Sequence, residues 1–260
     1  MGARSELLIA VDVGNTNTVL GVYVDDELAR DFRLSTDIER TADEYAALLL
    51  PLFEQAGLDP GAATGVIISS VVPPLHSAFD KLSRETFGQP PLFVEPGIKT
   101  GLPIRYKNPV EVGADRIVNS LAARERFGAP VIVVDFGTAT TFDVVNPAGE
   151  YAGGIIAPGL AISAEALFSH ASRLYQVEIQ KPDQLIGEHT AGAMQSGLFY
   201  GYIGLVDGIL ERLLKEIPEV QRVVATGGEA ELIASGSRHI DEVDAGLTLV
   251  GLKLIYDRNR

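Results

Sequence analysis

Two stretches of the chain have nearly the same pattern. The first reads Asp12-Val13-Gly14-Asn15-Thr16-Asn17-Thr18, and the second reads Asp135-Phe136-Gly137-Thr138-Ala139-Thr140-Thr141. Each follows a short apolar, mostly β-branched run and precedes another such run, so each predicts a strand, a tight polar turn and a second strand. An aspartate at a strand end, a glycine that lets a ligand approach the backbone, and small polar side chains are typical of a phosphate-binding hairpin.

Either stretch alone is equally compatible with an ordinary hairpin turn, because such turns favour Asp, Gly and Asn. The two stretches lie close to half of the 260 residues apart, in matched contexts, which favours a duplicated domain. We therefore expect two similar halves, residues 1–127 and 128–260, with a cleft between them. Facing hairpins in such a cleft would hold the phosphates of a nucleotide from both sides.

The rest of the pattern predicts an α/β fold in which mixed sheets carry flanking helices. Thr41 and Glu44 form a capping box at the start of one predicted helix. The predicted strands are 7–13, 19–24, 28–35, 65–70, 92–94, 131–134, 142–145 and 222–225. The predicted helices are 41–55, 73–87, 113–127, 159–173, 190–217 and 244–256. Residues 96–112 form a long connection without a clear period, which is typical of functional loops.

Composition narrows the class of protein. Hydrophobic residues make up 46% and charged residues 22%, as in a globular protein with a full core. No apolar run approaches 18 residues, so we expect no membrane span, and the lack of cysteine fits a cytoplasmic protein. The net charge of −14 argues against nucleic acid as a partner, because such binding needs Lys and Arg. An anionic substrate would need local cations, for which Arg105, Lys107 and Arg116 are candidates if they are not simply a solvated patch.

Common nucleotide-binding and hydrolase motifs are absent from the sequence. It has no G-x-x-x-x-G-K-[ST] loop, no G-x-G-x-x-G, no G-x-S-x-G and no H-E-x-x-H. Any nucleotide must therefore be bound by the paired hairpins.

Six motifs in a fixed order resemble those of the type III pantothenate kinases over nearly the whole chain. They are Asp-x-Gly-Asn-Thr-Asn at 12–17, Tyr-Lys-Asn-Pro-x-Glu-Val-Gly-Ala-Asp-Arg at 106–116, Asp-Phe-Gly-Thr-Ala-Thr-Thr at 135–141, Gly-Gly-x-Ile-x-Pro-Gly at 153–159, Met-Gln-Ser-Gly at 194–197 and Thr-Gly-Gly at 226–228. The resemblance implies duplicated ribonuclease-H-like domains, as in the superfamily of acetate kinases, sugar kinases and actin. It also implies a homodimer that needs a monovalent cation, potassium or ammonium, and Mg²⁺ with ATP.

The resemblance further implies a role for each matching position. ATP would be bound by Asp12, Val13, Gly14, Asn15, Thr16, Asn17, Thr18, Val19, Thr138, Thr226, Gly227 and Gly228. Pantothenate would be bound by Tyr106, Gly113, Ala114, Asp115, Arg116 and Thr190. Asp135 would bind the monovalent cation, Asp12 would lie near Mg²⁺, and Asp115 would be the general base.

Chemistry supports the role of Asp115, because phosphoryl transfer to an alcohol needs a proton acceptor. Beside Arg116 and at a helix start, this carboxylate should stay ionised at neutral pH. The structural alternatives are an aspartate that complements the helix dipole, an Arg116 that only pairs with it, and a Tyr106 that is a core or rim aromatic. Asp135 could likewise be a turn-capping residue that needs no ion.

Two places depart from the family's pattern. His189 stands where a small amide usually precedes Thr190, and residues 173–176 lack the usual Leu-Pro pair. The predicted helix 190–217 carries several glycines, which favour close packing of another helix, such as one from a second subunit.

The sequence thus predicts ATP-dependent phosphorylation of pantothenate at its primary hydroxyl, the first step to coenzyme A. One alternative is a kinase of another hydroxy acid or sugar, against which the motif at 106–116 argues. The other is a non-catalytic accessory factor for transcription, since some relatives are described so. A non-catalytic factor would not need the three aspartates Asp12, Asp115 and Asp135, and the net charge of −14 argues against direct contact with DNA.

Overall fold

The chain forms two compact units whose segments interleave in the sequence. The computed structural model describes residues 6–260. The first unit contains the chain up to Gly101, together with Asn108–Ala122 and Thr248–Arg260. The second contains Leu102–Lys107 and Ala123–Leu247. From the sequence we expected a single boundary after residue 127. In the structure, the C-terminal segment Thr248–Arg260 belongs to the first unit.

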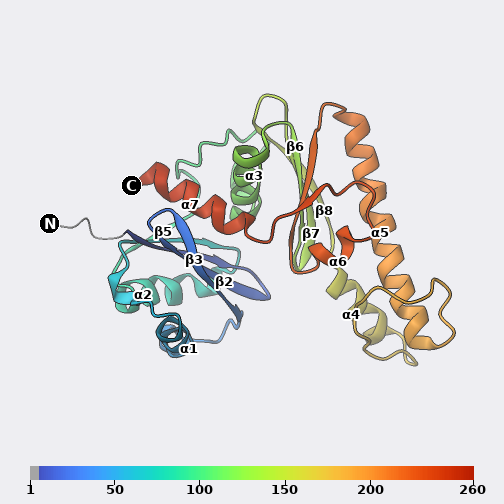
Figure 1. Ribbon diagram of the computed structural model, residues 1–260, viewed down its shortest axis with the longest axis horizontal. Helices are drawn as coiled ribbons and strands as arrows, with labels where there is room; N and C mark the ends of the chain where they lie inside the picture. Colours follow the sequence, from blue (N-terminus) through green and yellow to red (C-terminus); the bar gives the residue numbers. More distant parts are fainter. Residues whose placement is uncertain (1–5) are drawn as a thin grey trace. The chain divides into compact units, whose positions relative to one another are not determined.

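A five-stranded mixed sheet with the order β3-β2-β1-β4-β5 forms the centre of the first unit (Figure 1). Strand β1 pairs antiparallel with β2 and parallel with β4. The strands are β1 (Leu7–Val13), β2 (Asn17–Val24), β3 (Glu27–Ser35), β4 (Gly65–Ser70) and β5 (Pro91–Phe93). All five follow the predicted positions closely. For β1, β2 and β4 the reason is that their apolar runs are short, rich in β-branched residues and bounded by turn residues.

Helices α1 (Ala42–Gln55) and α2 (His76–Thr86) pack on one face of this sheet, and their buried side chains join those of β1 in one core. The predicted capping box at the start of α1 is present, with Thr41 and Glu44 bonding each other's backbone N–H groups. Short 3₁₀ turns lie at Pro60–Ala62, Pro73–Leu75 and Pro109–Glu111. Helices α3 (Ala114–Phe127) and α7 (Leu247–Asn259) cross closely, because a side chain at Gly251 would collide with the carbonyl oxygen of Val118 at 2.2 Å.

The second unit repeats the sheet of the first. Its order, β10-β9-β6-β7-β8, has the same pattern of antiparallel and parallel pairs when β6 is matched to β1 and β9 to β4. The strands are β6 (Val131–Phe136), β7 (Ala139–Val145), β8 (Tyr151–Pro158), β9 (Arg222–Gly227) and β10 (Glu242–Val243). The predicted duplication and the predicted fold class, paired mixed sheets with flanking helices, are confirmed.

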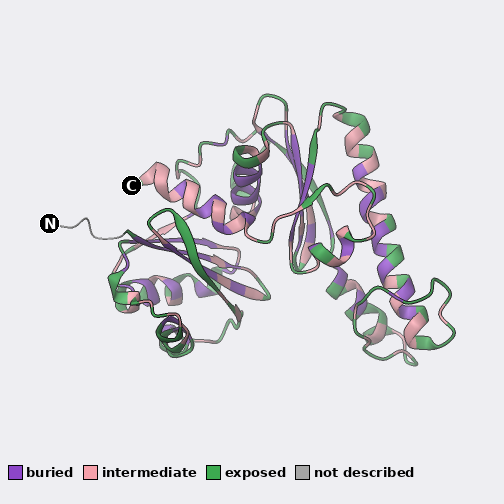
Figure 2. Cartoon of the chain, viewed as in Figure 1, coloured by how far each residue is buried: buried purple, intermediate pink, exposed green. Residues whose placement is uncertain are grey.

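Helix α5 (Thr190–Glu216) packs its buried side chains against the core of the second sheet, together with α4 (Leu160–His170) and α6 (Ala230–Ala234). Figure 2 shows that the inner strands of each sheet are largely buried and that the edge strand β3 is exposed, whereas the long helix α5 alternates between buried and exposed turns. The core of this unit includes Val134, Phe142, Phe199 and Val206.

The structure differs from the predicted elements in a few places. Strand β8 was not predicted, because its glycines weaken the strand pattern and Gly153 has φ of 116°. Helix α4 ends at His170 instead of Arg173. The C-terminal helix begins at Leu247 rather than Asp244, because the Asp244 carboxylate accepts a hydrogen bond from Gly246 N at 3.1 Å and forms a turn first.

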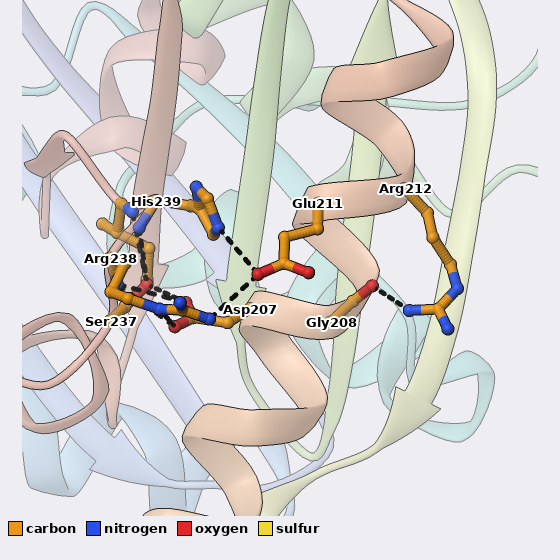
Figure 3. Close-up of polar contacts among 8 residues, drawn as sticks. Asp207, Gly208, Glu211, Arg212, Ser237, Arg238 and His239 are labelled. Atoms are coloured by element: carbon orange, nitrogen blue, oxygen red, sulfur yellow. Dashed lines mark hydrogen bonds and ion pairs between the residues drawn. The ribbon is translucent and has the colours of Figure 1, made fainter.

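A polar cluster ties α5 to the segment after α6 (Figure 3). The buried Asp207 carboxylate accepts from Ser237 Oγ at 2.6 Å and from Arg238 N and Nε, both at 3.2 Å. Glu211, one turn further along α5, accepts from Arg238 Nη2 at 2.9 Å. These bonds satisfy a carboxylate that would otherwise be costly to bury. Across residues 6–260, no helix has both the length and the apolar character that a membrane crossing requires.

Candidate functional site

The first predicted phosphate hairpin joins β1 to β2. Gly14 N donates to the carbonyl oxygen of Asn17 at 3.0 Å and closes the turn, and the intervening Asn15 and Thr16 are exposed. Behind the turn, the hydroxyls of the buried Thr18 and of Thr36 are hydrogen-bonded at 2.9 Å. The turn is thus held from behind while its polar tip faces solvent, as a phosphate-binding turn requires.

The second hairpin, between β6 and β7, has the same form but closes one residue sooner. Asp135 pairs with Thr141, and Gly137 N donates to the carbonyl oxygen of Ala139 at 3.1 Å. Gly137 and Thr138 are exposed at the tip. The buried Thr140 hydroxyl lies 2.5 Å from the Tyr202 hydroxyl of α5, which fixes the base of the hairpin.

Two glycines let neighbouring backbone approach this second hairpin. A side chain at Gly227 would collide with Asp135 Oδ1 at 2.6 Å, and Gly227 has φ of 94°, a conformation that favours glycine. A side chain at Gly159 would collide with the carbonyl oxygen of Thr138 at 2.2 Å. The Thr-Gly-Gly motif and the Pro-Gly motif therefore meet the second hairpin from two sides. The contact of Gly159 was not predicted, although its motif was noted.

Asp12, near the end of β1, has a strongly perturbed pKa. Its pKa is raised to about 7, first by burial and then by the negative charge of Asp115, while the nearby Ser69 hydroxyl lowers it. Asp12 is half-buried. A negative charge near a carboxylate raises the cost of ionising it, which adds to the effect of burial at Asp12.

Ser69 is a residue that the sequence reasoning missed. It is paired with Asp12 across β1 and β4, and its hydroxyl is fully buried without a well-formed hydrogen bond. In the second unit the corresponding pair is Asp135 and Thr226. The repeat therefore places a hydroxyl beside the strand-end aspartate in both units. This arrangement depends on the pairing of strands that are distant in the sequence, so a local sequence pattern could not predict it.

Asp115 lies in the first turn of α3, which begins at Ala114. Its Oδ1 accepts from Arg116 N at 2.8 Å, so the carboxylate folds back over the helix start. A side chain at Gly113 would collide with that same oxygen at 2.5 Å, which explains why glycine precedes the helix. Arg116 is 8% exposed. Asp115 and Asp12 both belong to the first unit, and the negative charge of Asp115 contributes to the raised pKa of Asp12.

Tyr106 and Thr190 both belong to the second unit. The Tyr106 ring is 37% exposed. Thr190 begins α5 and lines an open pocket of about 520 Å³ whose other walls are largely apolar side chains of α4, α5 and the segment between them. The pocket residues are Ser163, Leu167, Leu174, Thr190, Ala193, Met194, Gly197 and Leu198.

His189, the departure from the family's pattern, has a clear structural role. Its Nδ1 accepts a hydrogen bond from Gly192 N at 3.0 Å and so caps the N-terminus of α5. A small amide at this position would supply the same acceptor, because Asn is among the preferred N-cap residues. The start of α5 is therefore stabilised in the same manner despite the substitution. Of the other candidate cations, Arg105 donates to Glu150 at 2.9 Å instead of standing free.

Within residues 6–260, no group of three or more His, Cys, Asp and Glu side chains could hold a metal ion alone.

The repeated mixed sheets, each with a polar hairpin at its first strand turn, define the class of the protein as a duplicated ribonuclease-H-like fold. Two solved structures share it: a putative 2-dehydro-3-deoxygalactonokinase from Sinorhizobium meliloti (TM-score 0.62, 13% identity, 96% of each chain covered) and a putative Baf family transcriptional activator from Campylobacter jejuni (TM-score 0.60, 22% identity, 96% of this chain and 98% of that one). At these identities the likeness establishes the fold.

The chain belongs to the type III pantothenate kinase family, whose family model matches residues 8–212. Type III pantothenate kinases from Anaeromyxobacter sp. (strain Fw109-5) and Geobacter sulfurreducens are 56% and 55% identical over 254 residues. Both alignments cover 98% of this chain and 100% of the relative. The family that the motif order indicated is thereby confirmed.

Proposed function

We propose that this chain is an ATP-dependent pantothenate kinase that forms 4'-phosphopantothenate, the first step of coenzyme A biosynthesis. The proposal rests mainly on the presence of two carboxylates in a chain of this family: Asp12 near the end of strand β1, and Asp115 in the first turn of helix α3. One carboxylate suits a cation and its phosphate, and the other suits the proton of an attacking alcohol. We propose a cytoplasmic enzyme without a nucleic-acid partner, in keeping with the net charge of −14.

We propose the following roles for residues of each unit. ATP is bound by the first hairpin, Asp12 to Val19, and in the second unit by Thr138, Thr226, Gly227 and Gly228. Pantothenate is bound by Tyr106, Thr190 and the start of α3, Gly113 to Arg116. Mg²⁺ near Asp12, when bound, neutralises charge on the phosphates and on the transferred group. Asp135 holds a monovalent cation. A glycine at position 227 suits this role, because an added side chain there would lie 2.6 Å from Asp135 Oδ1.

In the proposed reaction, Asp115 accepts the proton of pantothenate's primary hydroxyl as its oxygen attacks the γ-phosphorus of ATP. The bond between the γ-phosphorus and the β,γ-bridging oxygen breaks, and ADP leaves. The hydrogen bond from Arg116 N to Oδ1 helps to hold the Asp115 carboxylate in one orientation for the alcohol. The proton leaves late in a loose transition state, so Asp115 need not be a strong base.

An acceptor panel tests this function. ATP consumption by the purified chain is measured in a coupled assay with pantothenate, glycerol, gluconate or acetate as acceptor. We expect consumption to depend on pantothenate alone. Comparable rates with a sugar or another hydroxy acid would support the alternative kinase, and no acceptor-dependent consumption would reject an enzymatic role.

Arg116→Ala is expected to raise the KM for pantothenate about tenfold or more, with less than a threefold change for ATP. Pantothenate is a carboxylate anion, and a buried Arg offers it paired donors that are expensive to replace. Steady-state kinetics with each substrate varied in turn measure the two constants. Equal losses for both substrates would instead assign Arg116 a structural role, most simply in holding Asp115.

Removal of monovalent cations is expected to reduce turnover about tenfold or more, because the cation beside Asp135 would offset repulsion between that carboxylate and the phosphates of ATP. Activity is compared in potassium, ammonium, sodium and Tris buffers of equal ionic strength. Full activity without potassium or ammonium would contradict the proposed cation site.

The homodimer is proposed to form through the glycine-bearing face of α5. Gly197, Gly201 and Gly204 are exposed, and a side chain added at any of them would meet no atom within 4 Å. Nothing in the chain's own second unit therefore explains these glycines, whereas a second helix could pack closely there.

Gly201→Glu is accordingly expected to fold normally but to shift the protein from a dimer to a particle of the 27.7 kDa chain mass. Light scattering measures the mass, and circular dichroism checks the fold. The matched control is Ala47→Glu, an exposed helical position on α1. A wild-type monomer, or a dimeric Gly201→Glu variant, would reject this interface.

A further inference from the structure

The strand β8 begins with a buried tyrosine that lies beneath the proposed substrate residue Tyr106. We propose that the buried pair of Asp143 and Tyr151 acts as a positioning unit that holds Tyr106 for pantothenate. The proposal rests on the proposed function, because it takes Tyr106 to contact the substrate. All of the residues involved belong to the second unit.

The first support is the way in which backbone bonds attach the Tyr106 segment to Tyr151. Tyr151 N donates to the carbonyl oxygen of Pro103 at 2.8 Å, and Arg105 N donates to the carbonyl oxygen of Tyr151 at 2.8 Å. Ile104 is therefore paired with Tyr151 as an isolated parallel bridge. Tyr106 follows this bridge directly, so its Cα position depends on where Tyr151 stands.

The second support is the anchoring of the Tyr151 side chain. Tyr151 is fully buried, and its hydroxyl donates to Asp143 Oδ1 at 2.8 Å. The other carboxylate oxygen of Asp143 accepts from Thr141 Oγ1 at 2.8 Å. Asp143 is itself only 1% exposed. A buried carboxyl group is costly unless its oxygens are hydrogen-bonded, so the Tyr151 phenol and Asp143 help to hold each other in place.

The third support is the contact between the two rings and a glycine. The ring centroids of Tyr106 and Tyr151 are 6.3 Å apart and the rings are inclined by 47°. Next to them, a side chain at Gly153 would lie 3.4 Å from Tyr106 Cε2, so the Tyr106 ring also rests on the bare backbone of β8. The exposed Tyr106 ring is thus supported from beneath by a fixed aromatic surface.

The repeated fold itself does not require the pair of Asp143 and Tyr151. The corresponding strand in the first unit, β3, is mostly exposed and carries no buried tyrosine, although its sheet has the same order. Tyr151 and Asp143 are therefore a feature of the second unit alone, which is where the Tyr106 segment is attached.

Tyr151→Phe tests the proposal, because it keeps the ring and removes the hydrogen bond to Asp143. We expect the KM for pantothenate to rise about fivefold, which corresponds to the loss of one hydrogen bond, while the KM for ATP and kcat stay within a factor of two. In a Tyr106→Ala background, Tyr151→Phe is expected to add less than a twofold change, because the residue through which it acts is gone. Tyr45→Phe, which removes a buried phenol bond to Asp37 in the first unit, is the matched control and should leave the pantothenate KM unchanged.

Hydrogen exchange of the Arg105 amide gives a readout that does not depend on activity. Tyr151→Phe is expected to accelerate it about threefold or more, whereas Tyr45→Phe is not. Failure of the wild type to phosphorylate pantothenate would reject the proposed function. An unchanged exchange rate of the Arg105 amide in Tyr151→Phe would separately reject the positioning unit. Equal increases in both KM values, or an undiminished effect in the Tyr106→Ala background, would also overturn it.

Discussion

Asp115→Asn is expected to lower turnover by about 10²–10⁴-fold while leaving the fold and nucleotide binding intact. The substitution is nearly isosteric, and the amide oxygen can still accept the hydrogen bond that Arg116 N donates to Asp115 Oδ1 at 2.8 Å. It removes only the capacity to take the proton of the attacking alcohol. Steady-state kinetics give the turnover number, and calorimetric titration with an ATP analogue gives nucleotide affinity.

Gly113→Ala supplies a useful comparison for this variant, because an added side chain would displace the same carboxylate without removing it. A turnover of Asp115→Asn within about threefold of the wild type would eliminate Asp115 as the general base. Loss of nucleotide affinity in parallel with turnover would mean that the carboxylate serves the phosphate side of the reaction.

Asp12→Asn is expected to reduce turnover about 10²-fold or more and, at the same time, to stabilise the protein at alkaline pH. Burial and the charge of Asp115 raise the pKa of Asp12 to about 7, well above its ordinary value. The folded protein therefore holds a proton between about pH 4 and 7 that the unfolded chain has released. The cost of ionising Asp12 in the folded state is absent below that window and fully present above it, so this group makes the protein less stable as pH rises.

Thermal or denaturant unfolding without Mg²⁺ measures this effect. Since Asp12 is partly open to solvent, we expect a gain of about 1–3 kcal/mol for Asp12→Asn at pH 8.5 and little change at pH 4.5. Asp31→Asn, at an exposed position on β3, removes the same charge and should give no comparable gain. A variant that is equally stable or less stable than the wild type at pH 8.5 would contradict the perturbed carboxylate pair.

Local patterns predicted the parts of the fold that depend on neighbouring residues. The two hairpins could be identified because each places an aspartate, a glycine and small polar residues between β-branched runs. The capping box at Thr41 could be identified because its partners are three residues apart. The duplication also followed from the sequence, since both hairpins kept the same context.

Features that depend on distant segments could not be predicted. Ser69 meets Asp12 only because β4 pairs with β1, and Gly159 meets Thr138 only because the chain returns to the second hairpin. Strand β8 escaped prediction because Gly153 and Gly154 suppress the strand pattern. The role of His189 could not be inferred either, because a histidine as N-cap acceptor is uncommon and its ring nitrogen reaches Gly192 only in the folded helix start.

Direct identification of the product tests the central claim most sharply. The purified chain is incubated with pantothenate, Mg²⁺, potassium and ATP whose γ-phosphoryl oxygens carry ¹⁸O, and the products are analysed by mass spectrometry. We expect pantothenate to gain one phosphoryl group that retains the labelled non-bridging oxygens, with formation of ADP, and no such product from Asp115→Asn over the same time. Labelled inorganic phosphate with unmodified pantothenate, or a product that forms equally in Asp115→Asn, would contradict the account.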